Sequence, residues 1–129
     1  MALERRTFLA GATALGIGGT SAAAAASGAT YGRVGKMTAV PGQREALAAI
    51  LIEGTAAMPG CLNYVVASDA TDADVLWITE AWTSKEAHAG SLALPAVRAA
   101  IAKGRPLIAG LQTIAETQPI GGVGLGPRL

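Results

Sequence analysis

The chain of 129 residues contains a single histidine, His88. An imidazole has an unperturbed pKa of about 6.5, so His88 is a candidate general base near neutral pH. Glu80 lies on a segment of alternating apolar residues, where a carboxylate loses contact with water and becomes a second candidate. Each has a structural alternative: a hydrogen-bonded imidazole on a helix surface, or a carboxylate bonded to Tyr64, a main-chain amide or a partner subunit.

Three side chains near Glu80 in the sequence could bind a small ring compound. Tyr64 could donate a hydrogen bond to an oxygen of a bound molecule, and Trp82 could stack on an aromatic ring. Asn63 is a polar residue in the middle of an expected strand and could orient a carbonyl group. The structural alternatives are core packing for Trp82 and a buried, satisfied hydroxyl for Tyr64.

Two cations and the only cysteine have simpler interpretations. Arg33 and Lys36 lie on opposite faces of the first expected strand, and we expect both to be solvated, with anion stabilisation as the alternative. Cys61 follows a Pro-Gly turn and has no base nearby in the sequence. We therefore expect it to be a small buried hydrophobic residue.

The composition argues against several classes of function. A formal charge of +1 and the absence of a basic stripe argue against a nucleic-acid partner. One cysteine excludes an internal disulfide framework, and one histidine with one cysteine makes a structural zinc site improbable. No GxxxxGK[ST] loop is present, and GIGGT at residues 16–20 lies in the wrong context for a dinucleotide fold. We expect no metal, nucleotide or flavin cofactor.

Residues 1–26 have the pattern of an export signal. Arg5 and Arg6 are followed by TFL, a weakly apolar run and an alanine tract with A-x-A cleavage sites. The RRTFL stretch resembles the twin-arginine motif, although Glu4 stands where Ser or Thr is usual. The predicted location is therefore the periplasm or the cell exterior. A retained membrane anchor is the alternative, but a segment so rich in Gly and Ala partitions weakly into a bilayer.

The remaining chain predicts the element order βαββααβ within one α+β domain at residues 31–118. It follows a linker at 27–30 and precedes a flexible Gly/Pro tail at 119–129. Strands are predicted from alternation at 31–40, 61–67, 75–82 and 111–117. A helix begins at Gln43 and stops at Pro59-Gly60, a second is capped by Thr83 with Glu86, and a third begins at Pro95.

This element order favours a ferredoxin-like topology with helices on one face of the sheet. Apolar side chains occur on both faces of the third strand, with Glu80 and Trp82 on one and Trp77 on the other. The face without helices therefore needs a cover. A second copy of the chain is the economical solution, which predicts a homodimer.

The segments PGCLNYVVASD, WITEAWTSKEAHAGSLALPAVRAAI and RPLIAG resemble the antibiotic biosynthesis monooxygenase (ABM) family over residues 31–118. The resemblance implies a ferredoxin-like protomer that pairs into a dimeric α/β barrel. It also implies O₂-dependent oxidation of a small quinol- or phenol-like aromatic without metal or flavin. In that chemistry the protein binds the ring, removes a proton and stabilises the anion.

The sequence departs from the family pattern in its histidines. Members often carry one later in the helix that follows E-x-W and another after an S-P pair, where this chain has Ser91 and Ala96. Two alternatives therefore remain open. One is a non-catalytic dimeric barrel that binds a small apolar ligand. The other is haem degradation, which would call for an Asn that the first strand, YGRVGKMTAV, lacks.

Overall fold

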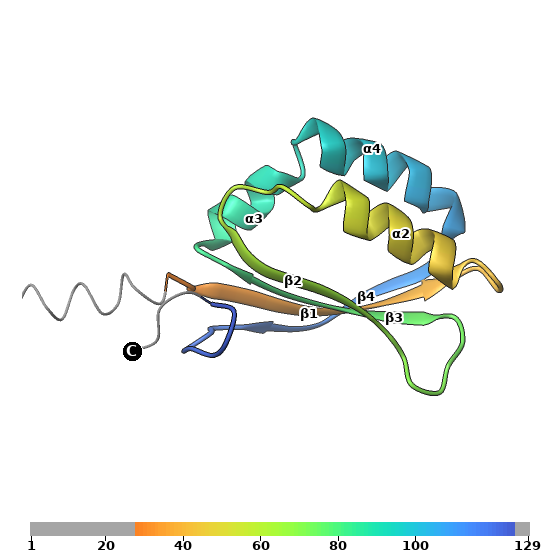
Figure 1. Ribbon diagram of the computed structural model, residues 1–129, viewed down its shortest axis with the longest axis horizontal. Coiled ribbons are helices and arrows are strands. Elements are labelled where there is room, and N and C mark those ends of the chain that lie inside the picture. The colour runs from red at the N-terminus through yellow and green to blue at the C-terminus, as the bar shows by residue number, and fades with distance from the viewer. Residues whose placement is uncertain (1–27, 126–129) are drawn as a thin grey trace, which may run out of the picture.

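A computed structural model describes residues 28–125 of the chain. The predicted export signal, with Arg5 and Arg6, lies outside these residues. Four strands and three α-helices follow in the predicted βαββααβ order (Figure 1). Their bounds are β1 Tyr31–Ala39, α2 Arg44–Gly54, β2 Cys61–Ser68, β3 Val75–Trp82, α3 Lys85–Ser91, α4 Pro95–Gly104, a short 3-10 helix Arg105–Leu107 and β4 Ile108–Thr117.

The strands form one antiparallel sheet in the order β2-β3-β1-β4, with all three helices on one face (Figure 1). This is the ferredoxin-like topology that the sequence predicts. The two strands that enclose the first helix, β1 and β2, are separated by β3. Within the part of the chain that the structure describes, no helix is both long and apolar enough to cross a membrane.

The helix boundaries confirm one sequence signal and correct two. Pro95 occupies the first turn of α4, as predicted. The predicted Thr83 cap is wrong by one residue: Ser84 is extended (φ −161°, ψ 162°), and its hydroxyl accepts a hydrogen bond from the Ala87 amide. The first predicted helix is also too long: α2 ends at Gly54, before the predicted stop at Pro59-Gly60.

The helix-side face of the sheet is packed by two hydrophobic clusters. The first lies between α2 and the sheet and contains Met37, Ala39, Leu47, Leu76 and Ile78. The second cluster lies toward α3 and contains Tyr31, Met58, Trp82 and Val97. Trp82 is only 1% exposed, and the aromatic-poor sequence therefore uses it as the main anchor at this end of the domain.

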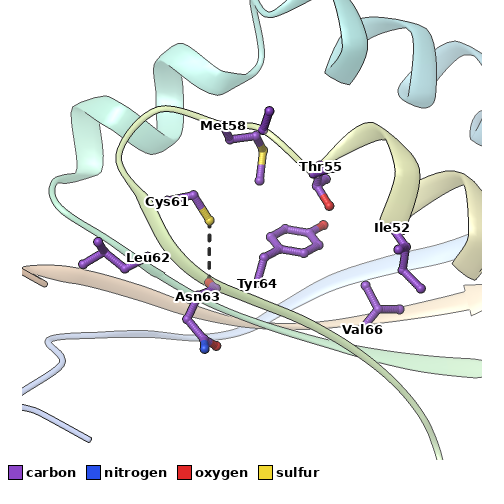
Figure 2. A pocket seen from close by; sticks show the side chains of 10 residues that line it. Ile52, Thr55, Met58, Cys61, Leu62, Asn63, Tyr64 and Val66 are labelled. Atoms are coloured by element: carbon purple, nitrogen blue, oxygen red, sulfur yellow. Dashed lines mark hydrogen bonds between the residues drawn. The ribbon is translucent and has the colours of Figure 1, made fainter. Parts of the chain in front are cut away.

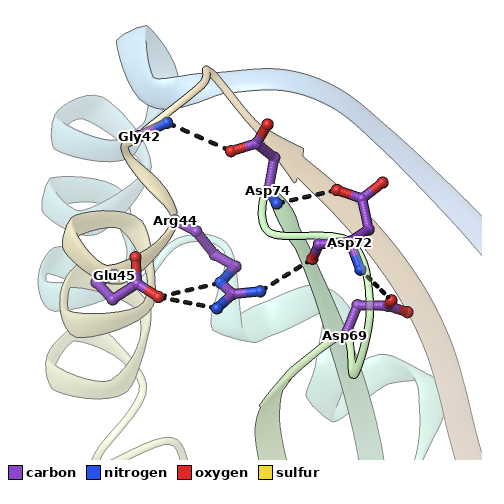
Figure 3. A network of polar contacts seen from close by, with 6 residues as sticks. All are labelled: Gly42, Arg44, Glu45, Asp69, Asp72 and Asp74. Carbon is purple, nitrogen blue, oxygen red and sulfur yellow. Dashed lines mark hydrogen bonds and ion pairs between the residues drawn. The ribbon is translucent and has the colours of Figure 1, made fainter.

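The β2–β3 loop is fastened to the start of α2 by polar contacts (Figure 3). The Arg44 guanidinium donates to the Asp72 carbonyl at 2.9 Å, and the Gly42 amide donates to Asp74 Oδ1 at 3.3 Å. Within the loop, the Asp72 amide donates to Asp69 Oδ2 at 2.8 Å. These contacts fix the hairpin end that lies away from α3.

Gly60 allows the turn before β2 to approach α3 closely. Its φ is +84°, a conformation that only glycine adopts at little cost. A Cβ atom at this position would lie 2.6 Å from Ala87 Cβ and 2.9 Å from Thr83 Oγ1. The Thr83 amide also donates to the Gly60 carbonyl at 2.8 Å. This glycine therefore sets the height of α3 above the sheet.

The face without helices is partly crossed by the segment after β4. A Cβ on Gly32 would contact the side chains of Thr117 and Pro119, and one on Gly124 would lie 3.1 Å from Asn63 Nδ2. Ile120 and Val123 of this segment are 86% and 90% exposed. Their apolar side chains therefore point into solvent in the single chain.

Candidate active site

A row of polar side chains crosses the helix-side face of the sheet, one from each strand. Tyr64 of β2 is paired with Glu80 of β3, Glu80 with Arg33 of β1, and Arg33 with Glu116 of β4. Side chains directly opposite on antiparallel strands have Cβ atoms roughly 4.5–5.5 Å apart. The register therefore brings together residues that lie up to 83 positions apart in the sequence, the separation of Arg33 and Glu116.

His88 closes this row from above, from the middle of α3. Its Nε2 atom lies 2.9 Å from an Arg33 terminal nitrogen and 3.8 Å from Glu80 Oε1. The ring packs edge-on against Trp82 and tilted against Tyr31, with centroid distances of 5.3 and 5.5 Å. The imidazole is thus held on three sides, with 13% of its side chain exposed.

Glu80 is the carboxylate of the row and is almost covered. Its side chain is 11% exposed, and Oε1 accepts a hydrogen bond from Trp82 Nε1 at 2.9 Å. The strand register confirms that Glu80 shares a face with Leu76, Ile78 and Trp82, while Trp77 lies on the opposite face. The structural partner of Glu80 is therefore Trp82, not Tyr64 or a main-chain amide.

A groove of about 530 Å³ lies beside β2, between this edge strand and the C-terminal end of α2 (Figure 2). A volume of this size is typical of small-molecule sites. Figure 2 shows the Tyr64 ring on the helix side of β2 and Asn63 on the opposite side. The groove is lined by Ile52, Thr55, Ala56, Ala57, Met58, Cys61, Leu62, Asn63, Tyr64 and Val66.

The two ionisable groups of the groove are both held in the neutral form. Burial raises the pKa of the Tyr64 phenol far above its ordinary value, and the negative charge of nearby Glu80 adds to this shift. Burial also raises the pKa of the Cys61 thiol, whose Sγ donates to the Asn63 carbonyl at 3.7 Å. Tyr64 is therefore a hydrogen-bond donor at neutral pH, and Cys61 is a poor nucleophile.

The structure brings four of the five predicted site residues together and separates one. Tyr64, Glu80, Trp82 and His88 lie on the helix side of the sheet, whereas Asn63 faces the side without helices. Cys61 is half-buried, not fully buried as expected, because it lines the groove. Among residues 28–125, no group of three side chains is arranged to hold a metal ion.

Arg33 is the member of the row that sequence reasoning undervalued. We expected a solvated strand residue, but its guanidinium donates to His88 and, at 2.7 Å, to Thr113 Oγ1. The Arg33 Nε atom is buried and has no hydrogen-bond partner among the described residues. The available signal was the strand alternation, since residues 31, 33 and 37 of β1 share the face that the helices cover.

A family model confirms the resemblance noted in the sequence. The model described as "ABM: Antibiotic biosynthesis monooxygenase" matches residues 30–103, more than half of the chain. The chain belongs to the antibiotic biosynthesis monooxygenase family. The match covers β1 to α4, and therefore includes every residue of the polar row except Glu116. A search of the curated proteins finds no significant relative.

Solved structures of the same fold support this assignment. A protein named "putative antibiotic biosynthesis monooxygenase" from Chloroflexus aurantiacus J-10-fl is 60% identical, with a TM-score of 0.72 over 75% of this chain and 99% of its own. One with the same name from Deinococcus radiodurans is 27% identical, with a TM-score of 0.56 over 71% and 92%. A third, from Caulobacter crescentus CB15, is 21% identical, with a TM-score of 0.64 over 71% and 91%, and shows the fold alone.

Proposed function

We propose that this ABM-family protein is a monooxygenase that oxidises a small phenol- or quinol-like aromatic with O₂, without a metal or organic cofactor. One observation carries the proposal: Tyr64 is both a wall of the groove and the direct cross-strand neighbour of Glu80. A ring in the groove then has its hydroxyl group at a neutral hydrogen-bond donor. A carboxylate lies one strand away. The name of the 60% identical Chloroflexus aurantiacus protein supports the reaction class.

The reaction begins with proton transfer from the bound phenol. The O–H bond breaks, Glu80 accepts the proton, and the electron pair remains on the phenolate oxygen, to which Tyr64 donates a hydrogen bond. The phenolate transfers one electron to O₂, and the phenoxyl radical and superoxide combine to form a C–O bond. The proton held by Glu80 returns to the peroxide oxygen, and loss of water, in which the ring C–H is also broken, then leaves a quinone. One oxygen atom of O₂ is in the product and the other is in water.

The groove suits such a substrate better than a charged one. Its wall combines apolar side chains, among them Ile52, Met58 and Val66, with the Tyr64 hydroxyl and no cation. Burial of a ring against these residues supplies binding energy, roughly 25 cal/mol for each Å² of apolar surface removed from water. Specificity for the hydroxyl position then depends on Tyr64.

Export and pairing of two chains complete the proposal. We propose that residues 1–26 direct twin-arginine export to the periplasm, on the basis of Arg5, Arg6 and the alanine tract. We also propose a homodimer that covers the helix-free face, which carries Val34, Trp77 and the 45% exposed Val65. Sedimentation of the wild-type protein and of Val65→Lys tests the pairing, since a buried lysine should dissociate the dimer.

Oxygen uptake with a panel of hydroquinones and phenols, measured with a chelator present, tests the activity. We expect uptake by the wild-type protein and a loss of at least tenfold in Tyr64→Phe, which keeps the ring but removes the donor. The matched control is Tyr31→Phe, because Tyr31 lies outside the groove. Ligand binding without oxygen uptake would contradict the proposal and favour a non-catalytic binding protein, and a haem absorption band would favour haem chemistry.

A further inference from the structure

We propose that His88 acts as a neutral hydrogen-bond acceptor that positions Arg33, and that Arg33 supplies the positive charge of the site. Both are positioning residues for Glu80. This inference rests on the proposed function for its catalytic consequence, but the contact between the two side chains can be tested without any turnover.

The protonation of the imidazole follows from the identity of its partner. A guanidinium is protonated at every pH at which proteins are folded, and it has donors but no acceptor. The 2.9 Å contact with Arg33 therefore requires a lone pair on His88 Nε2. A neutral ring with its proton on Nδ1 satisfies this requirement, whereas a doubly protonated ring would place two N–H groups against each other.

Among residues 28–125, the Arg33 guanidinium donates hydrogen bonds only to groups without a formal charge. Its two terminal nitrogens donate to His88 Nε2 and Thr113 Oγ1, and its buried Nε has no partner in the part of the chain that the structure describes. Within residues 28–125, no carboxylate forms an ion pair with it at 4.0 Å or less. A half-buried charge is costly when no opposite charge lies nearby. The strand register places two carboxylate residues directly opposite Arg33, namely Glu80 on β3 and Glu116 on β4.

This arrangement keeps the charge of the site balanced during proton transfer. Before the reaction, the negative charge opposite Arg33 lies on Glu80. After Glu80 accepts the proton, the negative charge lies on the substrate oxygen beside Tyr64. The guanidinium needs no movement between these two states, so the protein pays no reorganisation at the moment of reaction. His88 holds the guanidinium in place. Its Nε2 lone pair accepts the hydrogen bond from Arg33 and is therefore not free to accept a proton from the substrate.

The surroundings of His88 agree with a neutral ring. Burial lowers the pKa of His88 below its ordinary value, and the positive charges of Arg33 on β1 and Lys85 on α3 lower it further. Glu80 on β3 and Glu116 on β4 act in the opposite direction without reversing the shift.

NMR of the ring nitrogens tests the contact, because the chain has a single histidine and so a single pair of signals. In the wild-type protein we expect an unprotonated Nε2 and a protonated Nδ1 at neutral pH. In Arg33→Gln the pKa of His88 should rise, because a positive charge is removed while Glu80 Oε1 remains 3.8 Å away. The exposed Arg98→Gln on α4 is the matched control and should leave the titration unchanged.

Two substitutions of His88 separate positioning from proton transfer. Gln can place an acceptor oxygen near the position of Nε2, so His88→Gln should retain oxygen uptake within about fivefold, whereas His88→Leu should lose at least tenfold. An equal, near-complete loss in both would show that His88 is itself the base and would overturn the proposal, as would a protonated Nε2 in the wild-type protein. If the wild-type protein takes up no oxygen, the proposed function fails, while the NMR result still decides the Arg33–His88 contact.

Discussion

The chain contains two pairs in which a tryptophan donates to a carboxylate, one at each end of β3. At the hairpin end, Trp77 Nε1 donates to Asp69 Oδ1 at 2.7 Å. At the α3 end, Trp82 Nε1 donates to Glu80 Oε1 at 2.9 Å. The two indoles lie on opposite faces of the same strand, so the chemistry of the pairs is alike and their surroundings differ.

The two carboxylates differ in how many hydrogen bonds they accept. Asp69 Oδ2 accepts hydrogen bonds from the Asp72 amide (Figure 3) and from the amide and hydroxyl of Thr71. With the Trp77 bond to Oδ1, both oxygens of Asp69 have partners. Glu80 receives only the Trp82 bond among the described residues and lies beneath an imidazole. A carboxylate whose two oxygens both accept hydrogen bonds stabilises a turn. A buried carboxylate that accepts a single hydrogen bond is available to accept a proton.

Removal of each carboxyl charge should give the largest contrast. We expect Glu80→Gln to reduce the rate of oxygen uptake by at least about 100-fold, the usual contribution of a general base. Asp69→Asn should leave the rate within a factor of about two, because the loop lies at the far end of the strand. Equal rates in the two variants would show that Glu80 is a structural residue like Asp69.

Removal of each indole donor should affect stability unequally. Trp82→Phe leaves a buried acceptor without its donor and a small void, so we expect the free energy of unfolding to fall by about 2–4 kcal/mol. Trp77→Phe should cost only about 0.5–1.5 kcal/mol, since Trp77 is half-buried and Asp69 keeps its other donors. Urea denaturation of both variants measures the difference, and a larger loss in Trp77→Phe would reverse the ranking.

The pH dependence of stability should carry a signature of the α3 end near neutrality. The folded state holds the pKa of His88 below 6.5, so the unfolded chain binds more protons as the pH falls. The stability conferred by the neutral ring is complete above about pH 6.5 and is lost as the pH falls below it. Thermal unfolding between pH 5 and 8 should therefore show a decline in the wild-type protein that is weaker in His88→Gln.

Asp69 at the hairpin end should also make stability depend on pH, but at a much lower pH. This is the smallest effect that we predict. The hydrogen bond from Trp77, followed by those from the loop amides, holds the pKa of Asp69 well below its ordinary value of 3.8. Its contribution is present above roughly pH 4 and is lost as the pH falls further. Asp69→Asn should remove this acid-sensitive component and leave the decline near neutrality unchanged. Identical acid profiles for the two proteins would contradict this assignment.

The sequence predicted the strands and their faces because alternation is a local property. The placement of Glu80 and Trp82 on one face and Trp77 on the other followed directly from the two-residue period of a strand. The Arg33–His88 contact could not be predicted in this way. Each residue of a helix turns the face by about 100°, so the one-residue error at the Ser84 cap was enough to leave the direction of His88 undetermined.

The groove was also beyond prediction, because it depends on the distance between the end of α2 and an edge strand. Tyr64 and Cys61 line it from β2, while Ile52 of α2 and its C-cap residue Thr55 line it from the other side, and no periodicity links these two sets. The pairing of two chains and the export signal stay predictions.

The closeness of α3 to the sheet depends on Gly60, a residue that has no functional group. The methyl group of an alanine at this position would clash with Ala87 Cβ and force α3 away from the sheet. The imidazole of His88, the next residue, would move with the helix. The contact between His88 and Arg33 would lengthen first, while every polar residue stayed unchanged. A search for inactive relatives that compared only acids, bases and aromatic residues would miss the one position that sets their spacing.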